Sequence, residues 1–177
     1  MDYAVTSGTA SGSGTDYTLT SGTATVTKGG TTTNISVTVV NDSLDEANET
    51  FTVTLSNAGN SSLGTNTTHT YTITDNDDAP AIAFTASTSS GSEATSPVTI
   101  QVSLATASGL DATVDYAVTS GTASGSGTDY TLTSGTASIT AGNTSTTISA
   151  TINNDTLDED DETFVVTLSR SLSGKHF

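Results

Sequence analysis

The densest chemical feature of this sequence is a run of carboxylates immediately ahead of an apolar segment. Residues 154–164 read Asn-Asp-Thr-Leu-Asp-Glu-Asp-Asp-Glu-Thr-Phe, and six of these eleven residues are Asp or Glu. Residues 41–51 carry a less acidic version of the same pattern, at an offset of 154 − 41 = 113 residues. Clustered carboxylates repel one another and need a counter-charge. Because hard divalent cations take oxygen ligands, the pattern predicts Ca²⁺ sites, with Mg²⁺ as the weaker candidate.

The rest of the chain offers little positive charge to balance these carboxylates. Its 177 residues contain 3 Lys+Arg against 19 Asp+Glu, a net charge of −16. Nucleic acids and anionic membrane surfaces are therefore not expected partners, since both are bound through Lys and Arg. No apolar run approaches the roughly 18 residues of a transmembrane helix, so direct membrane insertion is not expected. The absence of Cys excludes disulfides and thiolate metal sites.

The acidic pattern belongs to a duplicated unit of about domain length. Residues 2–17 recur unchanged at 115–130, with the same offset as the acidic runs. We expect a first repeat at 1–79, a second at 80–169 and a tail outside the repeat at 170–177. The boundary follows from Pro80, which is disfavoured inside a central strand.

The two copies begin and end at different points of the repeated unit. The first has no equivalent of 81–110, and the second has no equivalent of 70–75, so we expect a piece of a longer repeat array. The first copy would then lack N-terminal strands and the second its last strand. Open sheet edges would result, which makes neighbouring repeats and another copy of the chain expected partners.

Apolar and polar residues alternate in short runs throughout both copies. Residues 35–39 and 148–152 are examples, with Ile, Val or Ala at every second position. A period of two, interrupted by Gly, Ser, Asn and Asp, predicts antiparallel strands with one buried face. No window of helical length shows a 3.6-residue period. We therefore expect an all-β fold, an immunoglobulin-like antiparallel β-sandwich in two tandem, incomplete copies.

These elements together resemble the Calx-β domain family. The resemblance rests on Gly-Thr-Asp-Tyr at 14–17 and 127–130, on the acidic runs ending in Glu-Thr-Phe, and on Thr-Ile-Thr-Asp-Asn-Asp at 72–77. It covers nearly the whole chain except the last few residues. The family occurs in the regulatory region of sodium–calcium exchangers and in many large bacterial surface proteins. The resemblance implies a sandwich related to immunoglobulin domains, with Ca²⁺ sites, where present, at one end near the inter-domain junction.

The resemblance also implies a set of Ca²⁺ ligands, carried over onto the matching positions. The acidic ones are Asp16, Asp42, Glu46, Glu49, Asp75 and Asp77 in the first copy and Glu93, Asp129, Asp155, Glu159 and Glu162 in the second. Asp78, next to the closing triplet, completes the predicted set. Asn stands in place of an acidic residue at 41 and 154, which lowers the charge of each site. The first copy has no equivalent of Glu93, and the second has no closing triplet.

Catalysis has weak support in this sequence. His69 and His176 are the only imidazoles, and no nucleophile elbow, phosphate-binding loop or zinc-protease motif is present. Two carboxylates could hydrolyse a glycoside, but Trp is absent and aromatics total 5%, too few for an aromatic-walled cleft. We do not expect an enzyme, and a hydrolase of unfamiliar design is the third hypothesis.

The leading hypothesis is a calcium-binding structural or adhesive module of an extracellular or cell-surface protein. In it, Ca²⁺ bound by the acidic loops at the domain ends would make the inter-domain junction rigid. The second hypothesis is a glycan- or protein-binding module without metal dependence.

Overall fold

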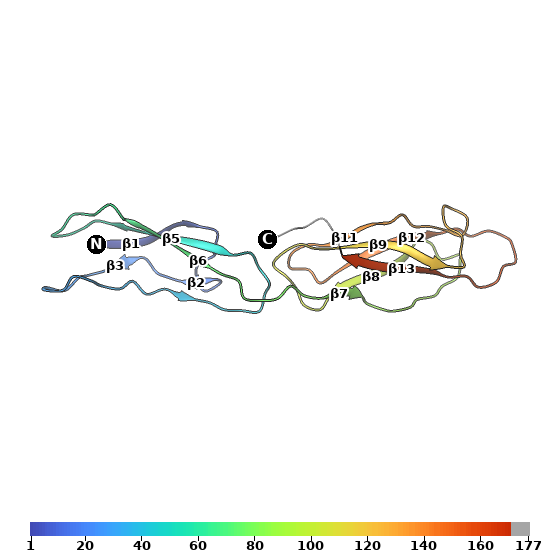
Figure 1. Cartoon of the computed structure of the whole chain (residues 1–177), viewed down its shortest axis with the longest axis horizontal. Coiled ribbons are helices and arrows are strands. Elements are labelled where there is room, and N and C mark those ends of the chain that lie inside the picture. Colours follow the sequence, from blue (N-terminus) through green and yellow to red (C-terminus); the bar gives the residue numbers. More distant parts are fainter. Residues whose placement is uncertain (171–177) are drawn as a thin grey trace. The chain divides into compact units, whose positions relative to one another are not determined.

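The computed structural model describes residues 1–170 and consists of β-strands joined by loops (Figure 1). The chain divides into two compact units, here called unit 1 (Met1–Asp77) and unit 2 (Asp78 onward). Every strand pair is antiparallel, and the expected all-β sandwich class is confirmed. Within the described residues, no helix has the length and apolarity needed to cross a membrane. Arg170 is the final residue of the last strand, and 171–177 of the predicted tail lie outside the described residues.

Unit 1 is built from two sheets. A four-stranded sheet has the order β3-β1-β5-β6, and a two-stranded sheet pairs β2 with β4. The strands are β1 (Asp2–Gly8), β2 (Tyr17–Thr18), β3 (Gly22–Thr23), β4 (Thr38–Val39), β5 (Glu49–Ser56) and β6 (Thr68–Ile73).

Unit 2 also has two sheets, with the orders β10-β12-β8-β7 and β11-β9-β13. Its strands are β7 (Ile82–Phe84), β8 (Val98–Leu104), β9 (Ala112–Gly121), β10 (Tyr130–Thr131), β11 (Gly135–Ile139), β12 (Ser145–Ile152) and β13 (Phe164–Arg170). When the repeat offset of 113 is added to their residue numbers, β1–β5 coincide in order with β9–β13. Within the described residues, β6 has no counterpart in unit 2, and β7 and β8 have none in unit 1.

Each unit buries its own apolar core, as the alternation of the sequence requires. The core of unit 2 joins both sheets through Val102, Val114, Ala137 and Ile148, which lie on β8, β9, β11 and β12. The core of unit 1 is centred on Tyr17, Phe51 and Val53. Phe51 is 2% exposed and lies on β5, the strand that follows the first acidic run.

One predicted strand is much shorter than its sequence pattern. The alternation at 35–39 indicates a strand, yet only Thr38 and Val39 are paired in β4. The matching strand β12 spans Ser145–Ile152 because its residues 145–150 pair with β8. Extended backbone counts as a strand only when a neighbour accepts its hydrogen bonds. Unit 1 has no such neighbour on that side within the described residues, so the pairing is confined to β2.

Candidate metal centre

Stacked aromatic rings bring two parts of each acidic centre together. In unit 1, the rings of Tyr17 and Phe51 stack with their centroids 4.5 Å apart. Tyr17 directly follows Asp16, and Phe51 lies two residues after Glu49. Burying the ring pair therefore carries these two carboxylates to the same end of the unit. In unit 2 the Tyr130–Phe164 stack, also at 4.5 Å, has the same geometry.

A backbone clamp holds the chain immediately after Glu49 in unit 1 and after Glu162 in unit 2. In unit 2, Thr163 N donates a hydrogen bond to Thr122 Oγ1 (2.9 Å), and Thr163 O accepts one from Ala123 N (2.9 Å). Gly121 makes the approach possible, because a Cβ there would lie 2.2 Å from Thr163 O. Unit 1 repeats the clamp with Gly8, Thr9 and Thr50. Sequence reasoning missed this clamp, although its Gly-Thr dipeptide lies inside the unchanged repeat.

Backbone amides orient the aspartates of both centres. Asp16 Oδ2 accepts a hydrogen bond from Ser11 N, and Asp129 Oδ2 accepts one from Ser124 N. Asp42 Oδ1 accepts from Leu44 N at 2.9 Å, the local turn that Asp side chains favour. Its counterpart Asp155 makes the same bond to Leu157 N at 2.7 Å. The side chains are thus held by their own loops before any ion is considered.

Five carboxylates form the centre of unit 1: Asp16, Asp42, Glu46, Glu49 and Asp75. Partial burial raises the pKa of Glu46, with further contributions from the charges of Asp42, Asp16 and Asp75. Partial burial also raises the pKa of Glu49, followed by its hydrogen bond to Asp16 and by the charges of Asp16 and Glu46. Both glutamates are therefore harder to ionise than an isolated one, as expected for like charges packed together.

Asp75 reaches this centre through a contact that sequence reasoning did not single out. Its backbone N donates a hydrogen bond of 2.9 Å to Asn48 Oδ1, which fixes the chain where it leaves β6. Asn48 lies inside the first acidic run, and the only hint of this contact in the sequence is an amide side chain next to Glu49. The matching residue of unit 2 is Asp161, and the described residues of unit 2 include no counterpart of Asp75 to donate to it.

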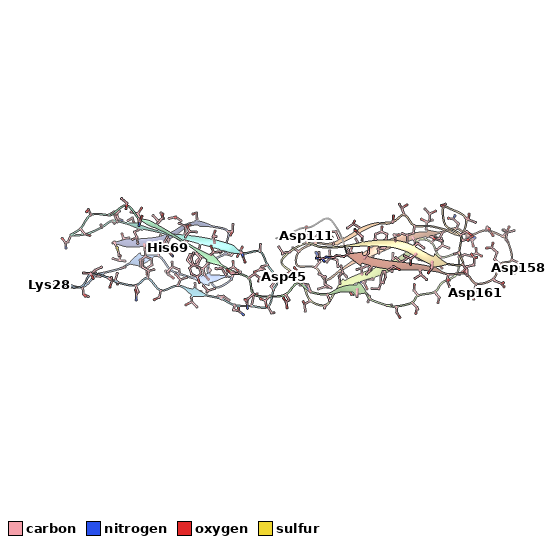
Figure 2. The ribbon with its side chains drawn as sticks, in the orientation of Figure 1. Lys28, Asp45, His69, Asp111, Asp158 and Asp161 are labelled. Carbon is pink, nitrogen blue, oxygen red and sulfur yellow. The ribbon has the colours of Figure 1, made fainter. Side chains whose placement is uncertain are left out.

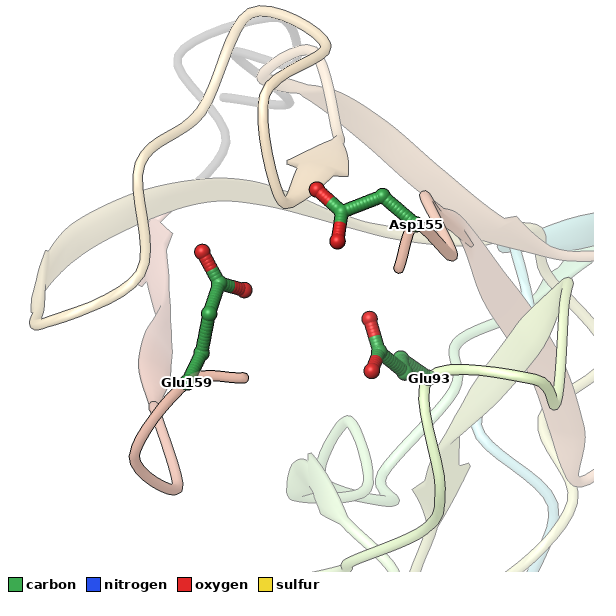
Figure 3. A group of neighbouring side chains, drawn as sticks. All are labelled: Glu93, Asp155 and Glu159. Atoms are coloured by element: carbon green, nitrogen blue, oxygen red, sulfur yellow. The ribbon is translucent and has the colours of Figure 1, made fainter. Parts of the chain in front are cut away.

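Unit 2 brings three carboxylates still closer together. Glu93, Asp155 and Glu159 place one oxygen each within 4.8 Å of one another, and all three residues are exposed. Figure 3 shows their carboxylates pointing toward a shared space from two loops. Glu93 lies between β7 and β8, whereas Asp155 and Glu159 lie between β12 and β13.

The other two members of this centre are Asp129 and Glu162. The charge of Asp155 is the largest cause of the raised pKa of Glu159, ahead of desolvation and of the charges of Asp129 and Glu93. For Glu162, desolvation is the largest cause of a raised pKa, followed by its hydrogen bond to Asp129 and by the charges of Asp129 and Glu159. The position that Asp75 occupies in the centre of unit 1 has no equivalent here, and Glu93 adds the fifth carboxylate instead.

The donor set suits a hard divalent cation. Ca²⁺ binds oxygens at about 2.3–2.6 Å, so two oxygens on one ion lie up to about 5 Å apart. The 4.8 Å limit of the Glu93, Asp155 and Glu159 oxygens falls within this span. Neither Cys nor His is among the candidate ligands, which favours Ca²⁺ or Mg²⁺ over softer metals.

Several residues of the acidic runs are not among the predicted ligands. Figure 2 shows Asp45 at the end of unit 1 opposite Lys28, and Asp158 and Asp161 at the end of unit 2 opposite Asp111. They mark the tips of the acidic loops. Of the remaining predicted ligands, Asp77 ends unit 1 half-buried, and Asp78 is exposed and begins unit 2. A ligand role for Asp77 and Asp78 stays a prediction.

Without divalent ions, we expect the chain to be more stable near pH 5 than near pH 7.5. The centres contain four glutamates with raised pKa: Glu46, Glu49, Glu159 and Glu162. A raised pKa means that the folded state holds the proton more tightly than the unfolded state. This contribution to stability is fully present below the unfolded value of 4.5 and is lost as the pH rises through the folded values. Urea unfolding midpoints at the two pH values measure the difference.

Calcium at a saturating concentration is the control for this pH comparison. A bound cation favours the ionised glutamates, so it should reduce or reverse the difference between the urea midpoints at pH 5 and pH 7.5. Asp2 acts in the opposite sense, since hydrogen bonds from Thr23 and then Asn57 lower its pKa from 3.8. Its contribution is lost only as the pH falls below that value, so it does not affect the comparison. A calcium-free urea midpoint that is higher near pH 7.5 would contradict the prediction.

Comparison with known proteins gives two kinds of match. Residues 1–77 and 75–176 each match the Calx-beta domain. A crystal structure of CBD12 from CALX1.2 is similar at 23% identity and a TM-score of 0.47, over 99% of this chain and 70% of that chain. A crystal structure of calcium binding domain CBD12 of CALX1.1 is similar at 23% identity and a TM-score of 0.48, over 95% and 66%. No curated protein sequence matches the chain.

Proposed function

The chain belongs to the Calx-beta family, with two tandem domains, and from this premise we propose that each domain binds Ca²⁺ through its acidic centre. The observation that carries the proposal is the trio Glu93, Asp155 and Glu159, whose oxygens lie within 4.8 Å of one another. An acidic loop that was only solvated would gain nothing from holding three carboxylates this close, because their repulsion opposes folding. The centre of unit 1 has Asp42 and Glu46 at the positions of Asp155 and Glu159, with Asp75 in place of Glu93, and binds Ca²⁺ through these residues.

In unit 2 the ion is held by Glu93, Asp155 and Glu159, with Asp129 and Glu162 beside them. Bound Ca²⁺ supplies positive charge that offsets the repulsion and joins three separate loops. In unit 1, Asp75 connects the bound ion to the segment that follows β6 and leads toward the next domain. Ca²⁺ therefore stiffens the chain where it leaves unit 1, which makes the protein a calcium-dependent structural module.

We place the parent protein outside the cell or on its surface. The candidate ligands are exposed or half-buried, and Asn stands at 41 and 154 where a further carboxylate would strengthen binding. Such centres suit dissociation constants of about 10⁻⁴–10⁻³ M, the range of extracellular calcium modules. The net charge of −16 also favours cations near the surface. An adhesive role of the parent protein is part of this proposal.

A calcium titration followed by amide chemical shifts tests the proposal, because it reports on the two domains separately. We expect saturable shifts for residues 42–49 and 155–162. Glu159→Gln removes one charge from the trio at nearly constant size and should weaken binding in unit 2 about tenfold or more, while unit 1 keeps its affinity.

Asp158→Asn is the matched control for this titration. It removes the same charge from the neighbouring residue, which is exposed and lies outside the trio. We expect a loss of about twofold or less, from the weaker overall field alone. Equal losses of Ca²⁺ affinity in the two variants would show that the acidic loop attracts cations only through its overall charge. The absence of saturable shifts would contradict the proposal.

A further inference from the structure

The loop that presents the first aspartate of each acidic centre has the same sequence in both units. Residues 8–17 and 121–130 both read Gly-Thr-Ala-Ser-Gly-Ser-Gly-Thr-Asp-Tyr. The backbone of the two loops also agrees, with φ of 94° at Gly14 and 93° at Gly127. Any difference in how firmly the two loops are held must therefore come from residues outside them.

One such residue directly follows the strand that passes each loop. It is Asn153 after β12 and Val40 after β4, and both side chains are half-buried. Their backbones make the same contact, because Asn153 N donates to Asp129 O and Val40 N donates to Asp16 O, each at 2.9 Å. The two chain segments thus meet the loop in the same way, but they present different side chains to it.

The side chain of Asn153 holds the loop of unit 2 through two hydrogen bonds. Its Nδ2 donates to Gly127 O and to Thr128 O, the second at 3.1 Å. Both acceptors are carbonyl oxygens, so the amide faces the loop with its NH₂ group. Val40 carries no donor for the matching carbonyls of residues 14–15 in unit 1.

The two carbonyls that Asn153 holds belong to the residues immediately before Asp129. Asp129 is the carboxylate that this loop contributes to the acidic centre, where it is hydrogen-bonded to Glu162. Gly127 has a positive φ of 93°, and glycine is the residue with the largest backbone freedom to lose. Holding this turn in advance reduces the ordering cost that ion binding would otherwise have to meet.

We propose that Asn153 is a positioning residue of the calcium centre in unit 2, acting through Asp129 by holding its loop in the binding conformation. The inference rests on the proposed function, because it concerns how tightly the centre binds Ca²⁺. Residues that orient a metal ligand from outside typically change metal affinity by about 10- to 100-fold. Asn153 is only half-buried, so its effect belongs at the lower end of this range.

A reciprocal exchange of the two side chains tests the inference in the whole chain. Asn153→Val gives unit 2 the side chain of unit 1 and should weaken Ca²⁺ binding in unit 2 about tenfold, while unit 1 keeps its affinity. Val40→Asn supplies the missing donor and should strengthen binding in unit 1 about threefold or more. Amide shifts of residues 42–49 and 155–162 during a calcium titration report the two affinities separately. A gain in unit 1 cannot arise from damage to the fold, so the test holds even if Asn153→Val folds poorly.

A double-mutant cycle with Asp129→Asn distinguishes positioning from a general loss of structure. If Asn153 acts through Asp129, Asn153→Val should change the Ca²⁺ affinity of the Asp129→Asn chain by about twofold or less. The full tenfold loss in that background would overturn the inference, because a merely structural effect adds in both backgrounds. Affinities left unchanged by the reciprocal exchange would overturn the inference and leave the proposed function intact. A parent chain that binds no Ca²⁺ would overturn both.

Discussion

Millimolar Ca²⁺ is expected to raise the thermal unfolding temperature of the chain by roughly 5 °C or more above its value in a chelating buffer. An ion that binds only the folded state stabilises it by RT ln(1 + [L]/Kd), about 1.4 kcal/mol at ten times Kd and about 2.7 at a hundred times. In a domain of this size, 1 kcal/mol corresponds to about 4–8 °C. The gain comes from offsetting the repulsion from Asp155 that is the largest cause of the raised pKa of Glu159.

Magnesium at the same concentration is the first control for this melt. Mg²⁺ demands octahedral geometry at about 2.0–2.1 Å and retains water, so exposed carboxylates on separate loops suit it less well. The double variant Asp129→Asn with Glu162→Gln is the second control. It relieves part of the repulsion, so it should melt higher than the parent chain in chelator and gain less from Ca²⁺. Equal shifts with the two ions would identify a general charge effect instead of a site.

Replacing Gly121 with Ala should destabilise unit 2 by more than about 3 kcal/mol. The backbone of Gly121 has φ +142°, which L-residues rarely adopt, and an added Cβ would lie 2.2 Å from Thr163 O and 2.7 Å from Phe164 Cα. These contacts are with backbone atoms, so the two strands must separate. Separation breaks the clamp at Thr163 and moves Glu162 away from Asp129. The urea midpoint of unit 2 measures the loss.

Gly142→Ala separates steric overlap from backbone strain. Gly142 also has a positive φ, +80°, but an added Cβ would meet nothing within 4 Å. We expect it to cost only about 1–2 kcal/mol, the usual penalty of the left-handed region. Gly8→Ala should repeat the larger loss in unit 1, because a Cβ there would lie 2.2 Å from Thr50 O. Equal losses at Gly121 and Gly142 would show that the close approach contributes nothing.

Most of the architecture was predictable from the sequence, because it depends on local pattern. Alternation at 148–152 indicated β12, since a half-buried strand needs apolar residues at every second position. The repeated Asp-Tyr and Glu-Thr-Phe elements indicated two equivalent acidic centres. The stacks of Tyr17 on Phe51 and of Tyr130 on Phe164 show why these elements occur together, since each ring pair carries two carboxylates to one end of a unit.

The family resemblance implied Glu93 and Asp75 as ligands, but only the tertiary structure shows which residues each of them meets. Glu93 lies beside Asp155 and Glu159 across about sixty residues of sequence, and in unit 1 the hydrogen bond from Asp75 N to Asn48 Oδ1 holds the end of β6 at the acidic loop. Spacing within a motif does not contain such contacts, because they depend on how strands order themselves in the sheets. The same dependence left 31–37 outside any strand. A strand requires a neighbour as well as a pattern, and only the assembled sheet shows whether that neighbour is present.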